Sequence, residues 1–210
     1  PDLSYVEAAT RMIAPYVEAG NIVILESTSP VGTTEDIVAG ILKDAGHDID
    51  KDVYVAHCPE RVLPGRILTE LVENDRIVGG VNKAATEKAV EFYNTFVRGE
   101  VLVTDSRTAE MAKLTENAFR DVNIAFANEL SLICDQENIS VWELVALANR
   151  HPRVNILQPG PGVGGHCIAV DPWFIVSRVP GLARLIRTAR EINDYKPKWV
   201  VDKVQRSADR

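Results

Sequence analysis

Residues 21–27 read NIVILES, a short apolar run of the kind that forms a buried strand in a parallel β-sheet. A helical pattern over 4–19 precedes this run, and a second helix beginning near Thr33 follows it. Further strands are predicted over 53–56, 76–79 and 100–104, with a helix over 83–97. Strands and helices that alternate in this way predict an α/β domain with a parallel sheet.

Helical periodicity replaces the strand pattern after Asp105. Residues 107–150 carry a long helical pattern and then a second helix over 141–149, a Pro/Gly-rich loop covers 151–166, and helices are predicted from Asp171 and Leu182. We therefore predict two domains. Residues 1–106 form the C-terminal part of a Rossmann-like domain, 107–194 form a helical central domain, and 195–210 continue a long connecting helix.

The composition is that of an acidic globular protein. The 210 residues are 46% hydrophobic and 25% charged, and the net charge is −7. This charge argues against a nucleic acid or an anionic membrane as the main partner. No apolar run approaches the roughly 18 residues of a membrane-spanning helix. The three cysteines lie at scattered positions without a disulfide pattern, so we expect a cytoplasmic protein.

A glycine-rich stretch, GPGVGGHC at residues 160–167, carries the clearest sign of chemistry. Glycine lets the backbone approach a ligand closely, and a thiol beside a histidine can act as a nucleophile. Cys167 is therefore the candidate nucleophile, with His166 before it and Asp171 four residues later. The alternative is that Cys167 is a small buried hydrophobic residue, as we expect for Cys134.

Polar residues at two other places could serve a ligand. Lys113, Asn117 and Arg120 fall on one face of a predicted helix, which could hold an oxygen-rich ligand or could be a solvated polar stripe. Ser27 and Thr28 follow one predicted strand, and Glu60 follows the next. Such positions lie where open α/β sheets bind ligands, although a turn and a surface carboxylate explain them equally simply.

One expected motif is absent from the α/β part. A dinucleotide-binding domain opens with a strand, a G-x-G-x-x-G turn and a helix, and no glycines of this part are so placed. The phosphate-binding first half of such a sheet would have to precede Pro1. We therefore expect the chain to be a piece of a longer protein and to be inactive by itself.

Taken together, four motifs resemble the UDP-glucose/GDP-mannose dehydrogenase family over essentially the whole chain. They are ESTSPVG at 26–32, CPER at 58–61, KLTENAF at 113–119, and GGHC at 164–167 with Asp171. Relatives that oxidise UDP-glucose often have a second glutamate where this chain has Pro64, and a lysine where it has Val170. Both differences favour the branch that oxidises acetamido sugars over UDP-glucose or GDP-mannose 6-dehydrogenases.

The resemblance implies a four-electron oxidation of the carbon-six alcohol of a UDP-sugar, with NAD as cofactor. Cys167 would form a thiohemiacetal and then a thioester. Lys113 and Asn117 would stabilise the oxyanion, Asp171 would order a water or the lysine, and Glu60 would assist thioester hydrolysis. Ser27 and Thr28 would lie by the nicotinamide. Substrate contacts are implied for Arg61, Val62, Lys113, Asn117, Arg120, His151, Arg153 and Gly164.

The resemblance and the long apolar helix over 107–140 also predict a homodimer formed through the helical domain. Two other interpretations stay open. One is a hydroxyacid dehydrogenase with a helical second half, which transfers a single hydride and needs no thiol. The other is a non-catalytic dimerisation or metal-binding module, in which the pairs His57-Cys58 and His166-Cys167 would hold zinc, although their spacing is unlike that of known zinc sites.

Overall fold

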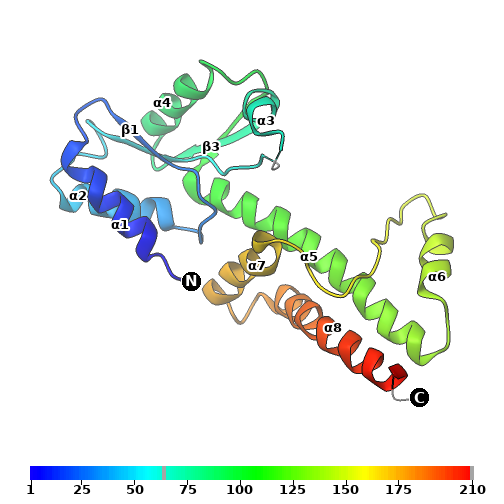
Figure 1. Ribbon diagram of the computed structural model, residues 1–210. Coiled ribbons are helices and arrows are strands. Elements are labelled where there is room, and N and C mark those ends of the chain that lie inside the picture. Colours follow the sequence, from blue (N-terminus) through cyan, green and yellow to red (C-terminus); the bar gives the residue numbers. More distant parts are fainter. Residues whose placement is uncertain (63–64, 209–210) are drawn as a thin grey trace. The chain divides into compact units, whose positions relative to one another are not determined.

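The chain divides into two units, residues 1–114 and 115–210. The computed structural model describes residues 1–62 and 65–208, with the side chain of His166 left out. Pro64, one of the two differences from relatives that oxidise UDP-glucose, lies outside the described residues. Unit 1 contains the strands β1 to β4 and the helices between them, and unit 2 is helical (Figure 1).

Unit 1 alternates helices and strands, as the sequence predicts. Its elements are α1 (Ser4–Ile13), a 3-10 turn (Ala14–Tyr16), β1 (Ile22–Leu25), the π-helix η2 (Thr33–Val38), α2 (Ala39–Asp44), β2 (Tyr54–His57), α3 (Ile67–Glu73), β3 (Arg76–Gly80), α4 (Lys83–Tyr93), β4 (Val101–Asp105) and the first turns of α5 (Ser106–Gln136). The helix α3 was not predicted, because the loop that contains it carries no clear helical period.

The four strands form one sheet in the order β1-β2-β3-β4. Parallel pairing, as predicted, joins β1 to β2 and β3 to β4. The central pair differs, because β2 and β3 run antiparallel. The chain leaves β2, passes through α3 and turns back, so β3 begins at the edge of the sheet where β1 and β2 end.

Helices cover both faces of this sheet (Figure 1). On one face, Val38 and Leu42 of the η2–α2 segment pack against Val55 of β2. On the other face, Ala89 and Tyr93 of α4 pack in one cluster with strand residues that include Val78. Side chains alternate between the two faces along each strand, so two separate apolar clusters hold β1 and β2 in place.

Unit 2 consists of the remainder of α5 together with α6 (Val141–Ala148), α7 (His166–Arg178) and α8 (Arg184–Ala208). The two long helices run side by side in the same direction and are joined by a polar seam (Figure 1). The seam consists of Asp121, Asn128, Ser131 and Asp135 on α5 and Arg190, Asn193, Lys196 and Lys203 on α8.

The helix α7 begins five residues earlier than predicted. The prediction from the sequence places its start at Asp171. In the structure Gly165 adopts φ +82° and the helix begins at His166, so that Pro172 lies inside it. Cys167 therefore lies in the first turn of a helix, directly after the glycine-rich loop.

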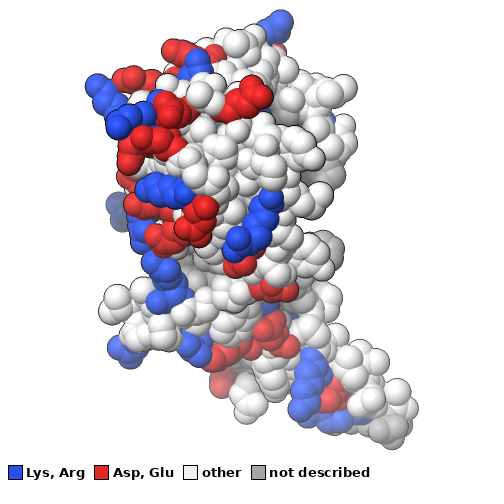
Figure 2. Space-filling view, turned by 90° about the vertical axis from the view of Figure 1, so that its left-hand side faces the viewer, with Lys and Arg blue, Asp and Glu red and all other residues white. Residues whose placement is uncertain are grey.

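Charged side chains of both signs are mixed on the surface. On the face seen in Figure 2, lysine and arginine side chains stand among aspartate and glutamate side chains and do not form one continuous basic patch. Exposed ion pairs between such side chains include Arg98–Glu73 and Lys88–Glu91. No helix in the described part of the chain has both the length and the apolar character needed to cross a membrane.

Candidate functional site

Two adjacent strand ends in unit 1 hold predicted cofactor and catalytic residues. Leu25 and His57 are register partners at the ends of the parallel strands β1 and β2. Beyond the strands, the Cys58 N–H donates to the Leu25 carbonyl over 3.1 Å, and the Glu60 N–H donates to the Glu26 carbonyl over 3.1 Å. The two segments thus continue side by side, which brings exposed Ser27 and half-buried Thr28 to the same sheet edge as Glu60.

The Glu60 carboxylate is held in place by its own loop. Its Oε1 accepts hydrogen bonds from the N–H groups of Arg61 at 2.6 Å and Val62 at 2.8 Å. Its Oε2 lies 3.4 Å from Nη1 of Arg76, which is 2% exposed. Arg76 is the first residue of β3 and reaches this edge because β3 runs antiparallel to β2. The sequence does not point to Arg76, since an arginine at a strand start gives no sign of burial.

Several titratable groups are buried beneath this edge. The Tyr93 hydroxyl donates to Oε1 of Glu26 over 2.6 Å, and burial raises the pKa of Tyr93. Burial also raises the pKa of the Cys58 thiol, so this cysteine remains protonated near neutral pH. Burial lowers the pKa of His57 to about 4, which keeps its imidazole neutral. Within the described residues, no group of three His, Cys, Asp or Glu side chains is arranged to hold a metal ion.

A second residue to which the sequence does not point is Glu110 of α5. Its side chain is buried and accepts hydrogen bonds from the Gly32 N–H at 2.5 Å, the Thr34 N–H at 2.8 Å and the Thr34 hydroxyl at 2.7 Å. Gly32 has φ +95°, a conformation that favours glycine. Burial raises the pKa of Glu110, and these hydrogen bonds oppose that rise. Glu110 therefore anchors the turn that follows Ser27 and Thr28 to the start of α5.

The predicted polar face of α5 divides into three environments. Lys113 is half-buried, and among the described residues it forms no hydrogen bond or ion pair. Asn117, one turn further along the helix, is 4% exposed, and its Nδ2 donates to Oδ2 of Asp171 over 2.6 Å. Arg120 is exposed. The face is therefore not a uniformly solvated stripe, because Asn117 is buried and hydrogen-bonded to Asp171.

The helix α7 carries the candidate nucleophile. Cys167 is exposed and lies in the first turn, where unpaired backbone N–H groups favour negative charge. Asp171 lies one turn later on the same helix face and is buried. Since Asp171 accepts the hydrogen bond from Asn117, unit 2 links α5 to the first turns of α7 through a buried amide–carboxylate pair. Gly164, just before the helix, is exposed.

The predicted substrate residues His151 and Arg153 lie on an exposed loop. Asn149 closes this loop, since its Nδ2 donates to the Ile156 carbonyl over 2.9 Å and its Oδ1 accepts from the Ile156 N–H over 2.7 Å. The Arg153 N–H donates to Nδ1 of His151 over 3.3 Å. The hydrogen bonds of Asn149 thus close the loop that carries His151 and Arg153. Both side chains are accessible to a ligand from solvent.

Comparison with known proteins matches both parts of the chain to one family. Residues 1–97 match the NAD binding domain of the UDP-glucose/GDP-mannose dehydrogenase family, and residues 107–195 match its central domain. The chain is 62% identical to an NDP-N-acetyl-D-galactosaminuronic acid dehydrogenase of Ralstonia solanacearum, over 100% of this chain and 51% of that protein. It is also 62% identical to the UDP-N-acetyl-D-mannosamine dehydrogenase of Escherichia coli K12, over 98% of this chain and 50% of that protein.

Solved structures agree with this match. A UDP-D-ManNAc dehydrogenase from Pyrococcus horikoshii superposes with a TM-score of 0.92 at 47% identity, covering 100% of this chain and 50% of that one. The UDP-N-acetyl-mannosamine dehydrogenase of Staphylococcus aureus gives a TM-score of 0.89 at 54% identity, covering 98% and 49%. The chain thus spans about half the length of the relatives that it matches.

Proposed function

Because the chain belongs to the UDP-glucose/GDP-mannose dehydrogenase family, we propose that it is the catalytic core of an NAD-dependent enzyme that oxidises the carbon-six alcohol of a UDP-sugar to a carboxylate. The observation that carries this proposal is the arrangement in unit 2. An exposed thiol stands at the start of α7, and one turn later Asp171 binds Asn117 of α5. A single-hydride dehydrogenase has no use for such a thiol.

The reaction proceeds in two oxidation steps. The alcohol first loses a hydride and a proton to become an aldehyde, and the Cys167 sulfur then adds to the aldehyde carbon to form a thiohemiacetal. Loss of a second hydride from that carbon gives a thioester. Water then attacks the thioester, which releases the carboxylate and regenerates the thiol. The covalent link prevents the aldehyde from diffusing away between the two oxidations.

The other candidate residues stabilise charge and position water. Lys113 supplies a positive charge, and Asn117 an amide donor, for the oxygen that becomes negative when the thiol adds. Asp171 orients Asn117 through the 2.6 Å hydrogen bond. Glu60 positions the water for thioester hydrolysis, and its fixed carboxylate, which accepts hydrogen bonds from two N–H groups of its own loop, supports this role.

The sheet edge of unit 1 fits the cofactor. Ser27 is exposed and Thr28 half-buried just beyond the carboxyl end of β1, the position where open α/β sheets bind dinucleotides. Bound NAD supplies the acceptor for each hydride. In our proposal the hydroxyls of Ser27 and Thr28 orient the nicotinamide, while Glu110 holds the turn that follows them.

UDP-N-acetyl-D-mannosamine is the substrate that we propose, since a UDP-N-acetyl-D-mannosamine dehydrogenase is 62% identical to the chain over the 213 residues that align, half of its own length. The second candidate is an acetamido-galactose derivative, which the equally similar Ralstonia protein favours. Arg61, Val62, Arg120, His151, Arg153 and Gly164, together with Lys113 and Asn117, are the proposed substrate contacts.

Spectrophotometry at 340 nm tests this function. The full-length protein, given UDP-N-acetyl-D-mannosamine and NAD, is expected to form two NADH for each acid produced. The rate with UDP-glucose should be at least ~100-fold lower, because a site built for an acetamido group leaves its polar groups unpaired with a hydroxyl. Residues 1–210 alone should show no turnover. One NADH per product would contradict the proposal and favour a hydroxyacid-type dehydrogenase.

We also propose that the protein is a homodimer formed through the helical unit. Three large apolar side chains on α5 are exposed at seven-residue intervals, namely Phe119 (68%), Phe126 (51%) and Ile133 (52%). Residues at this spacing form one stripe along a helix, and such a stripe on a second copy would cover it.

Sedimentation velocity tests the dimer. Phe126→Glu is expected to yield monomers at micromolar concentrations, because it places a charge in the centre of the stripe. Leu182→Glu, which changes an exposed leucine outside the stripe, should leave the sedimentation coefficient of the dimer unchanged. A monomeric unmodified protein would rule the proposal out.

A further inference from the structure

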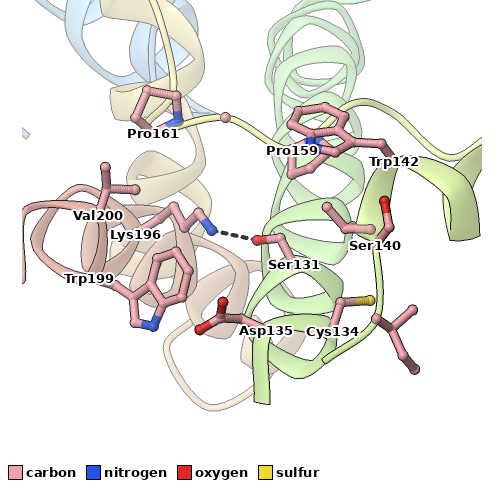
Figure 3. Close-up of a pocket in the computed structure, with 13 residues that line it drawn as sticks. Ser131, Cys134, Asp135, Ser140, Trp142, Pro159, Pro161, Lys196, Trp199 and Val200 are labelled. Atoms are coloured by element: carbon pink, nitrogen blue, oxygen red, sulfur yellow. Dashed lines mark hydrogen bonds between the residues drawn. The ribbon is translucent and has the colours of Figure 1, made fainter. Parts of the chain in front are cut away.

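Unit 2 contains a cavity of about 510 Å³ that none of the proposed catalytic residues lines. It lies where α5, α6, α8 and the segment 159–161 meet (Figure 3). Its walls are largely apolar and include Ile139, Trp142, Pro159, Pro161, Trp199 and Val200. This volume is within the range of pockets that hold small molecules.

One cation is buried in the wall of this cavity. Lys196 is 4% exposed, and its Nζ donates a hydrogen bond to the Ser131 hydroxyl (Figure 3). The Ser131 hydroxyl in turn donates to the Asn128 carbonyl over 2.6 Å, so its oxygen is left to accept from Lys196. The Nζ also lies 4.1 Å from the centre of the Trp199 ring.

Lys196 has no negative partner of its own. Asp135, the carboxylate that lines the same cavity, forms an ion pair with Lys203. Among the residues that the structure describes, no carboxylate forms an ion pair with Lys196. Burying an ammonium group without a counter-charge is costly, and the burial lowers the pKa of Lys196. A bound anion would reverse both effects.

We propose that this cavity binds a small aromatic monocarboxylate. The carboxylate accepts hydrogen bonds from the remaining N–H groups of Lys196, and the ring packs between Trp199 and the wall formed by Trp142 and Pro159. A phosphate or diphosphate is a poorer fit, because one ammonium faces the cavity and the Asp135 carboxylate lies beside it.

The site is separate from the proposed active site. Ser131, the α5 residue of the cavity wall nearest to Asn117, lies 14 positions beyond it, which corresponds to about 21 Å along the helix. The binding proposal therefore does not depend on the proposed function. The cavity does border the Pro/Gly-rich loop that precedes Cys167, because Pro159, Gly160 and Pro161 line it, and the Gly160 N–H donates to Oδ1 of Asn128 over 2.9 Å.

Calorimetric and tryptophan-fluorescence titrations with 2-naphthoate and its neutral amide, 2-naphthamide, test the proposal. The unmodified protein is expected to bind the carboxylate at least ~10-fold more tightly than the amide, since one charge-assisted hydrogen bond is worth about that factor. Lys196→Met should reduce this preference to less than ~3-fold. Lys198→Met, which removes an exposed lysine of the same helix, should leave it unchanged.

A second variant keeps the test valid if Lys196→Met does not fold. Val200→Trp fills the cavity and should abolish binding of both probes. Equal affinity of the unmodified protein for carboxylate and amide would overturn the proposal, as would a preference that survives Lys196→Met. Absence of binding by either probe, which would result if a second copy of the chain covers the cavity, would overturn it as well.

Discussion

Replacing Cys167 with serine is expected to abolish formation of the acid by the full-length protein, with a loss of at least ~1,000-fold in kcat. A serine hydroxyl is a far weaker nucleophile than a thiolate, and a serine ester would be opened by water less readily than a thioester. The position of Cys167 makes this the most informative substitution, because its side chain is exposed in the first turn of α7. The measurement is formation of the acid from the UDP-sugar under saturating conditions, quantified by chromatography, because the first oxidation forms NADH without the thiol.

Cys134→Ala provides the matched control for this result. Cys134 is 2% exposed in α5 and has no part in the proposed reaction, so the variant should retain most of its activity per folded molecule. Calorimetry of the Cys167→Ser variant should show that substrate and NAD still bind. Full turnover by Cys167→Ser would remove the covalent mechanism and favour single-hydride chemistry, which needs no thiol.

The second large effect concerns the stability of unit 2. Arg190→Met is expected to lower the free energy of unfolding by about 3–5 kcal/mol, because it leaves a buried carboxylate without its cation. Arg190 is 2% exposed and Asp121 is 0% exposed, and Nη1 lies 2.6 Å from Oδ1 of that carboxylate. Asn193 donates a further hydrogen bond to Oδ1 of Asp121 at 2.8 Å. In Arg190→Met this hydrogen bond remains, but it supplies no positive charge to the buried carboxylate.

Urea unfolding followed by tryptophan fluorescence measures this effect. The three tryptophans of the chain, at 142, 173 and 199, all lie in unit 2, so their emission reports on that unit. Arg184→Met is the matched control, because Arg184 is an exposed arginine of the same helix, and surface substitutions usually change stability by about 0.5 kcal/mol or less. A shift for Arg190→Met no larger than that of the control would contradict the assigned role of the seam.

The regular elements of this protein follow from local sequence pattern. Short apolar runs correctly indicated all four strands, and the helical period indicated α1, α4, α5 and α8. These predictions succeed because the period of apolar side chains is a property of each segment alone. The pairing of strands is not such a property. The antiparallel direction of β3, which brings Arg76 to Glu60, depends on how the intervening segment packs.

For the candidate site, too, the residues follow from the sequence, whereas their contacts do not. Its motifs could be identified in the sequence, and they led to Cys167, Asn117 and Asp171 as candidates. That Asn117 binds Asp171, 54 residues away, appears only in the tertiary structure. Glu110 shows this most clearly, because a carboxylate near the start of a helix is ordinarily solvated, yet here it is buried against Gly32 and Thr34.

From the sequence follow the family, the succession of strands and most helices along the chain, and the residue types that are available for catalysis. Which polar groups are buried, which of them are paired, and that Cys167 lies in the first turn of a helix became known only from the folded chain. The two kinds of feature differ in how far apart in the sequence the interacting residues lie. Helix and strand periods depend on neighbours within a few residues, whereas the burial and partners of Glu110, Arg190 or Asp171 depend on segments tens of residues away.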